Sequence, residues 1–258
     1  MSRLFLALSA FLICVLAETA HAGPIIVPPS LRPGDHYQLL FVTRDSVSAL
    51  STNIADYNKF VTMEATGLTA LLSQQPVTWT AIASTPFVNA ISNAPQLDAV
   101  YDLLGARITT LDADHGLYHT STTPLEQLPD VDQFGTRDPA SYGERVWTGS
   151  APNGYEGVVD VYSPQLMAVI SVPSGLGTQS PIQGFDTVTG PGYIASTPFG
   201  YPPAQFAHLY ALSSELVVLP EPSTIVILGG GLLGLAFYQM ATGARRKQLP
   251  ELPISHPR

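Results

Sequence analysis

The densest group of side chains that can hold a metal ion lies near the middle of the chain. Asp112, Asp114, His115 and His119 place two carboxylates and two imidazoles within eight positions. Carboxylate oxygen and imidazole nitrogen are ligands of zinc, and carboxylates also bind calcium. The segment lacks the Gly and Glu positions of an EF-hand loop, and an Asx-rich turn in solvent has the same composition. Both interpretations stay open, a metal site and a solvent-exposed turn.

A second acidic group, Asp130 and Asp132, follows further along the chain. Two carboxylates separated by one residue project from the same side of an extended segment and can bind Ca²⁺. Calcium is the cofactor for which both groups contain candidate ligands. A hydrated acidic loop is the alternative.

Catalytic motifs are absent from the sequence. It contains no Gly-x-Ser-x-Gly, His-Glu-x-x-His or Ser-x-x-Lys motif, no phosphate-binding loop and no dinucleotide fingerprint. We therefore predict no catalytic residue and expect that the protein is not an enzyme. Because a catalytic carboxylate pair can be distant in sequence, a secreted carbohydrate-active hydrolase stays as an alternative.

The regular elements that must position these residues are few. Apolar residues spaced three and four apart predict one long helix over 51–72, capped by Ser51, Thr52 or Asn53. Short apolar runs predict strands at 37–43, 77–83, 145–148 and 209–218, while 99–109 fits either a strand or a short helix. Residues 110–200 are rich in Pro and Gly and are expected to form long loops. The pattern predicts an α+β fold class.

One hexapeptide, Ile-Ala-Ser-Thr-Pro-Phe, occurs twice, at 82–87 and 194–199. The sequences that flank the two copies do not match. We interpret the copies as two similar exits from strands into turns rather than as a duplicated domain.

The order of these segments resembles a C-type-lectin-like fold. The resemblance rests on the Leu-Leu-Phe-Val-Thr strand, the helix that begins near Asn53, the strand 78–83, Val146-Trp147-Thr148-Gly149 and the closing segment 209–212. It implies that the closing segment pairs beside the first strand. The chain lacks the Glu-Pro-Asn, Gln-Pro-Asp and Trp-Asn-Asp motifs and the disulfides of that family, so the resemblance assigns no sugar-binding or calcium-binding residue.

The first 22 residues are typical of a secretory signal peptide. Arg3 precedes an uncharged apolar run over 4–17, and Ala20 and Ala22 are the small residues that signal peptidase requires before Gly23. We expect export through the Sec translocon, cleavage before Gly23 and a mature exported domain over 23–219. The only cysteine, Cys14, is lost with the peptide. An uncleaved membrane anchor is the alternative.

The other end of the chain predicts a membrane segment. Residues 224–244 form a stretch of 21 uncharged residues, which as a transmembrane helix spans about 31 Å. Arg245, Arg246 and Lys247 follow, as expected on the cytoplasmic side, and leave residues 248–258 as a short cytoplasmic tail. Directly before the segment, the extended motif 220–223 contains Pro220-Glu221-Pro222.

This arrangement over 219–247 resembles the PEP-CTERM sorting signal of Gram-negative bacteria. The resemblance implies recognition by an exosortase, a membrane cysteine protease or transpeptidase, and an association with extracellular polysaccharide and biofilm. The tail 248–258 departs from the family, which usually ends at the basic cluster. A permanent single-span anchor is the alternative.

The charge of the expected exported domain excludes one class of partner. Residues 23–219 contain 17 acidic and 6 basic side chains, a net charge of −11. Such a surface repels nucleic acid. We expect an exported protein that passes through the inner membrane and then serves the cell surface or extracellular matrix, as a non-enzymatic module that binds glycan or protein. The alternatives are the hydrolase and a plain type I membrane-anchored structural protein.

Overall fold

The computed structural model describes residues 26–72, 74–112, 116–119, 123–137, 145–163, 165, 167–195 and 200–220. The chain divides into two compact units, Met1–Val218 and Leu219–Arg258. The architecture described below is that of the first unit.

Strand β1 (His36–Val42) is the centre of the main sheet. Every residue of β1 except the first is buried. Successive side chains of a strand point to opposite faces, so a strand buried along its whole length needs a hydrophobic core on both faces. Alternate residues from Tyr37 enter one cluster, and Leu40 and Val42 enter a second.

The main sheet has the strand order β3-β11-β1-β4-β5. On one side of β1, strand β11 (Tyr210–Ser213) runs antiparallel, with Leu40 opposite Leu212. On the other side β4 (Val100–Tyr101) runs parallel, with Gln38 opposite Val100. The remaining strands of this sheet are β3 (Trp79–Ala81), β5 (Arg107–Thr109) and β12 (Leu216–Val217), which also pairs with β1.

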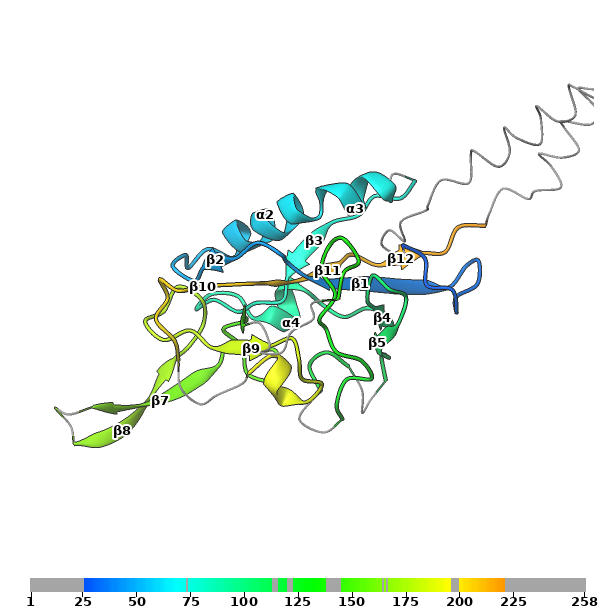
Figure 1. Cartoon of the computed structure of the whole chain (residues 1–258). Coiled ribbons are helices and arrows are strands. Elements are labelled where there is room, and N and C mark those ends of the chain that lie inside the picture. The colour runs from blue at the N-terminus through cyan, green and yellow to red at the C-terminus, as the bar shows by residue number, and fades with distance from the viewer. Residues whose placement is uncertain are drawn as a thin grey trace, which may run out of the picture. The chain divides into compact units, whose positions relative to one another are not determined.

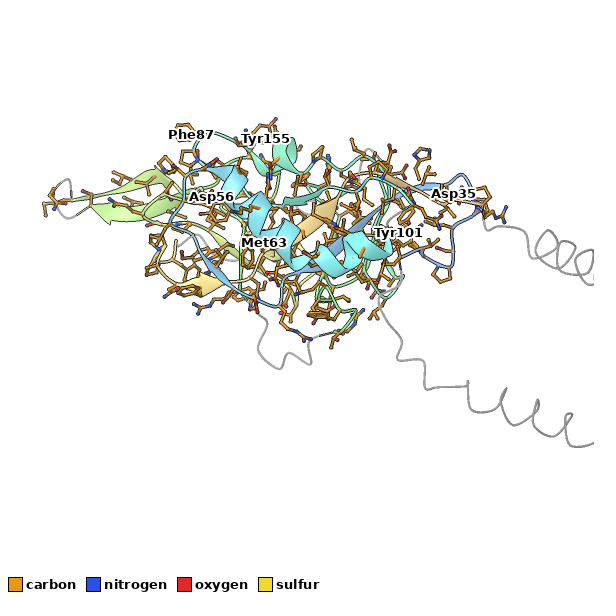
Figure 2. All side chains as sticks on the ribbon, turned by 90° about the horizontal axis from the view of Figure 1, so that it is seen from above. Asp35, Asp56, Met63, Phe87, Tyr101 and Tyr155 are labelled. Carbon is orange, nitrogen blue, oxygen red and sulfur yellow. The ribbon has the colours of Figure 1, made fainter. Side chains whose placement is uncertain are left out.

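Two consecutive helices, α2 (Ile54–Glu64) and α3 (Thr66–Leu71), cover one face of this sheet (Figure 1). Their buried side chains Tyr57, Val61 and Leu68 join the first hydrophobic cluster. The side chain of Asn53 caps α2 by accepting a hydrogen bond from the backbone N of Ala55 at 3.2 Å. Asp56 and Met63 lie on the exposed face of α2 (Figure 2).

Three small two-stranded sheets complete the unit. They are β2 (Val47–Ser48) with β10 (Phe206–Ala207), β6 (Arg145–Trp147) with β9 (Gln183–Phe185), and β7 (Val158–Ser163) with β8 (Ala168–Pro173). The hairpin of β7 and β8 projects from the rest of the unit (Figure 1). The short helices are α4 (Ala90–Asn93) and the 3₁₀-helix η1 (Pro191–Tyr193).

The α+β, C-type-lectin-like class that the sequence predicts is wrong, because the regular secondary structure of the described residues is mostly sheet. They form twelve strands and three α-helices, and only α2 has seven residues or more. The helix expected over 51–72 is interrupted at Ala65, and 99–109 forms the hairpin of β4 and β5. The strand predicted at 145–148 is β6, while part of the region expected to be loops forms its partner β9 and the hairpin of β7 and β8.

In the part of the chain that the structure describes, none of the helices is both long and apolar enough to cross a membrane. The signal peptide predicted for 1–22 and the transmembrane helix predicted for 224–244 lie outside the described residues.

Candidate binding site

An aspartate-centred turn, Asp132 to Thr136, presents two side chains next to α2 and α3. Oδ1 of Asp132 accepts hydrogen bonds from the backbone N of Phe134 at 2.9 Å and of Thr136 at 2.8 Å. Gly135 has a φ of +72°, a left-handed conformation that glycine adopts without strain. The turn therefore fixes Gln133 and Phe134 at its tip.

Arg44, just beyond the end of β1, holds this turn from one side. Its Nη2 lies 2.5 Å from Oδ2 of Asp132, and its Cζ lies 4.7 Å from the centroid of the Phe134 ring. A guanidinium over an aromatic face is attracted by the ring quadrupole. The carboxylate and the ring therefore fix Arg44 and Phe134 relative to each other.

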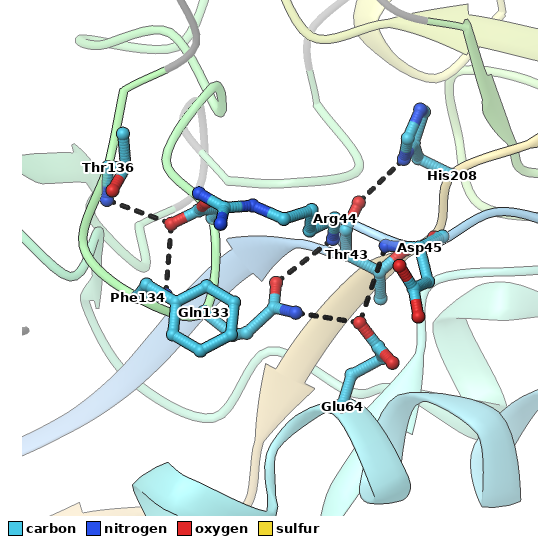
Figure 3. Close-up of polar contacts among 9 residues, drawn as sticks. Thr43, Arg44, Asp45, Glu64, Gln133, Phe134, Thr136 and His208 are labelled. Carbon is cyan, nitrogen blue, oxygen red and sulfur yellow. Dashed lines mark hydrogen bonds and ion pairs between the residues drawn. The ribbon is translucent and has the colours of Figure 1, made fainter.

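The backbone before Arg44 is fixed as well. Thr43 donates its backbone N–H to the Leu209 carbonyl at 2.8 Å, and its hydroxyl accepts from the Leu209 backbone N at 3.0 Å. Nδ1 of His208 lies 2.7 Å from the Thr43 carbonyl oxygen (Figure 3). The end of β1 thus positions the arginine.

Gln133 joins the end of β1 to the end of α2. Its Oε1 accepts a hydrogen bond from the backbone N of Arg44 at 2.9 Å, and its Nε2 donates to Oε2 of Glu64 at 2.7 Å (Figure 3). The side chain is only 7 % exposed. Buried amides are costly unless they are hydrogen-bonded, so these two contacts stabilise one orientation of Gln133.

A surface pocket lies between this turn and the helices. Glu64, Gly67, Leu68 and Leu71 line it from α2 and α3, and Gln133 and Phe134 line it from the turn; its volume is about 290 Å³. Phe134 is 56 % exposed and Leu71 is 59 % exposed. Oε2 of Glu64 also accepts from the backbone N of Asp45 at 3.4 Å. Within the described residues, Oε1 of Glu64 accepts no hydrogen bond, so one carboxylate oxygen is free to bind a ligand.

A second turn, Asp102 to Ala106, repeats the geometry of the first. Oδ1 of Asp102 accepts from the backbone N of Leu104 at 2.9 Å and of Ala106 at 2.8 Å, and Gly105 has a φ of +80°. Each aspartate offers its other oxygen to an arginine, since Oδ2 of Asp102 lies 3.3 Å from Nη2 of Arg137. The two turns therefore have the same hydrogen bonds, the same left-handed glycine and an arginine on the second oxygen of the aspartate.

Asp130 lies beside the second turn and is 4 % exposed. Its Oδ1 is 3.1 Å from Nη1 of Arg137. Burial raises the pKa of Asp130 above its ordinary value, and the charge of Arg137 opposes that shift. Arg137 thus serves two buried carboxylates, Asp102 and Asp130.

The residues predicted to bind metal are not brought together where the structure describes them. Asp130 and Asp132 each face an arginine, and Asp112 accepts a hydrogen bond from the Thr110 hydroxyl at 3.1 Å. His119 is exposed. Among the described residues, no group of three or more His, Cys, Asp and Glu side chains is arranged to hold a metal ion.

Several predicted residues lie outside the described part of the chain. They are Asp114, His115, the cleavage-site residues Ala20, Ala22 and Gly23, the sorting-motif residues Glu221 and Pro222, and the basic cluster Arg245, Arg246 and Lys247. Pro220 is described.

The residues that line this pocket were not predicted from the sequence. A signal was present, because 101–107 (Tyr-Asp-Leu-Leu-Gly-Ala-Arg) and 131–137 (Val-Asp-Gln-Phe-Gly-Thr-Arg) share an apolar residue, Asp, Gly and Arg at the same positions. An Asp followed three residues later by Gly is typical of a tight turn. No family model and no curated protein matches this chain.

Proposed function

We propose that this chain is an exported protein, sorted by an exosortase, whose folded unit is a non-enzymatic binding module of the cell surface or extracellular matrix. The observation that carries the sorting proposal is the order of features near the C-terminus. Pro220-Glu221-Pro222 precedes 21 uncharged residues and Arg245-Arg246-Lys247, in a chain that begins with a signal-peptide pattern. This order is what an enzyme acting at the outer surface of the inner membrane needs.

The pocket next to Phe134 supports a binding role for the folded unit. Ligand sites are mostly apolar concavities with a few placed polar groups. This pocket combines Leu68, Leu71 and Phe134 with the carboxylate of Glu64. We propose extracellular polysaccharide as the partner.

Replacing Pro220-Glu221-Pro222 with three alanines tests the sorting. In a Gram-negative host that has an exosortase, we expect the full-length variant to accumulate in the membrane fraction while the wild-type protein is processed. The matched control replaces Pro250-Glu251-Leu252, a similar tripeptide beyond the basic cluster, and should be processed normally. Unchanged processing of the first variant refutes exosortase sorting.

Screening the exported protein, purified from the culture medium, on a glycan array tests the binding role. We expect retention of one or more polysaccharides without release of reducing sugar. Release of reducing ends would instead establish the secreted hydrolase, and an array without any bound glycan would refute the glycan-binding role.

A further inference from the structure

We infer that the pocket lined by Glu64 and Phe134 binds a sugar ring that carries a free amino group, as in a cationic polysaccharide built from hexosamine. This inference rests on the proposed binding function and names the ligand class of the same site. It follows from the size of the pocket, its lining and its charge.

The size of the pocket fits a single ring. Its volume of about 290 Å³ is near the lower limit of ligand pockets, which are roughly 300–1,000 Å³. A linear lysine side chain would leave much of this volume unfilled, and wall atoms without a contacting partner lose dispersion energy. A pyranose ring fills the space better.

The lining requires a ligand with one apolar face and one hydrogen-bond donor. Leu68, Leu71 and Phe134 are apolar, and the C–H face of a sugar ring can pack on them. The Gln133 amide is already used by Arg44 and Glu64. The amide keeps one N–H and one lone pair, but Oε1 of Glu64 is the charged atom open to the ligand, and a carboxylate oxygen only accepts hydrogen bonds.

The charge of the site selects an ammonium group over an acid. Glu64 is the charged residue among the six that line the pocket, and its charge is negative. The guanidinium of Arg44 is paired with Asp132 and stacked on Phe134. Residues 23–219 carry a net charge of −11. Charge complementarity therefore favours an amino sugar and disfavours a uronic acid.

The side chains of the site are also preorganised for binding. The turn bonds of Asp132, the two hydrogen bonds of Gln133 and the stacked Arg44 fix Phe134 and Glu64 before binding. Fixing a site in advance lowers the entropy lost on association.

Calorimetric titration of the exported protein with a glucosamine tetramer at pH 6 tests the inference. We expect binding that weakens as salt is added, and weaker binding of the fully N-acetylated tetramer, which has no ammonium group. Equal affinity for the two tetramers, or affinity only for the acetylated one, overturns the inference.

Two variants locate the site. Glu64→Gln keeps an acceptor for Gln133 but removes the charge, and should weaken binding of the glucosamine tetramer about tenfold or more. Gly67→Leu should abolish that binding, because a Cβ at Gly67 meets no atom within 4 Å and the side chain can fill the pocket. Glu126→Gln, which removes the carboxylate that pairs with Arg107, is the matched control and should bind normally.

Cooperative unfolding with a midpoint no lower than that of the wild type shows that a variant folds, and Phe134→Ser replaces Gly67→Leu if that variant does not. Unchanged affinity in the folded pocket variants overturns the inference, as does binding of oligolysine in place of the sugar. If the protein binds other glycans on the array but not the glucosamine tetramer, the amino-sugar inference is refuted and the proposed glycan-binding function is retained. If no glycan binds, both fall.

Discussion

Nη2 of Arg137 lies 3.3 Å from Oδ2 of Asp102. The last residue of one heptapeptide, 131–137, thus forms an ion pair with the aspartate of the other, 101–107. Asp102 is fully buried. Arg107, the residue equivalent to Arg137, instead pairs with Glu126 at 2.9 Å, where both side chains are partly exposed. Arg107 and Arg137 occupy the same position in the two segments, but Arg137 pairs with buried carboxylates and Arg107 pairs at the surface.

Replacing each arginine with methionine tests this difference. Arg137→Met leaves the carboxylates of Asp102 and Asp130 buried without their cation, and should lower the free energy of unfolding by about 3–5 kcal/mol. Arg107→Met removes an exposed pair and should cost about 1 kcal/mol or less. Urea unfolding of the exported protein measures both. Equal losses of unfolding free energy in the two variants would contradict the difference in burial between the ion pairs of Arg137 and Arg107.

Two glycines should respond to alanine in opposite directions. Gly135→Ala forces a φ of +72° on a residue with a side chain, and should destabilise the protein by about 1–2 kcal/mol. Gly67→Ala lies within α3, where the added Cβ meets nothing within 4 Å, and should stabilise the protein by about 0.5–1 kcal/mol. Thermal and urea unfolding provide the comparison. A stabilising Gly135→Ala would show that the turn differs from the one described.

Alkaline pH should unfold the protein through its buried tyrosines. Burial raises the pKa of both Tyr37 and Tyr57 from 10.0 to about 12. Between these values the unfolded chain loses the phenolic proton before the folded protein does. The unfolded state then binds fewer protons, so the stability present below pH 10 falls as pH rises towards 12.

Tyr37→Phe removes one of these titrations. At neutral pH it should cost about 1 kcal/mol, because the hydroxyl donates to the Ile26 carbonyl at 2.9 Å. Above pH 10 the difference in free energy of unfolding between the variant and the wild type should shrink and then reverse. The reason is that ionisation of a fully buried phenol with this pKa shift lowers the free energy of unfolding of the wild type by up to about 3 kcal/mol. Tyr155→Phe, at a position 54 % exposed, is the control and should follow the wild-type curve. A constant difference at every pH would exclude titration of Tyr37.

The hairpin of β7 and β8 should contribute little to global stability. An isolated two-stranded hairpin is marginal in water, and among the described strands β7 and β8 pair only with each other. Replacing 160–171 with Asn-Gly keeps the pairing of Val159 with Val172 and closes it with a two-residue turn. The free energy of unfolding should change by less than about 1 kcal/mol. A loss of several kcal/mol in urea unfolding would mean that the hairpin belongs to the cooperative core.

Local sequence pattern predicted the elements whose stability is local or which are buried throughout. The apolar run at 37–43 is β1, Asn53 caps α2, and the closing run contains β11. The pairing of β11 with β1 was implied by the resemblance to a C-type-lectin-like fold and not by local pattern. The α+β class failed because short strands such as β4 and β5 contain too few residues to show alternation. Their pairing depends on neighbours distant in the sequence.

The candidate site was harder to predict for the same reason. Arg44, Glu64 and Gln133 are far apart in the sequence and meet because the turn after Val131 lies beside the end of β1. The exact hexapeptide repeat was misleading. Its first copy leaves β3, but its second begins after the 3₁₀-helix η1, and 196–199 lie outside the described residues. The inexact heptapeptide repeat, in contrast, forms the same turn twice.

Both heptapeptides begin beside β1. Tyr101 pairs with Leu39 in the parallel ladder of β4 and β1, and the Val131 carbonyl accepts a hydrogen bond from the backbone N of Val42 at 2.9 Å. The connection between the two turns supplies none of the six residues that line the pocket. Substitutions at exposed positions of that connection therefore change the surface around the pocket without replacing any side chain that lines it.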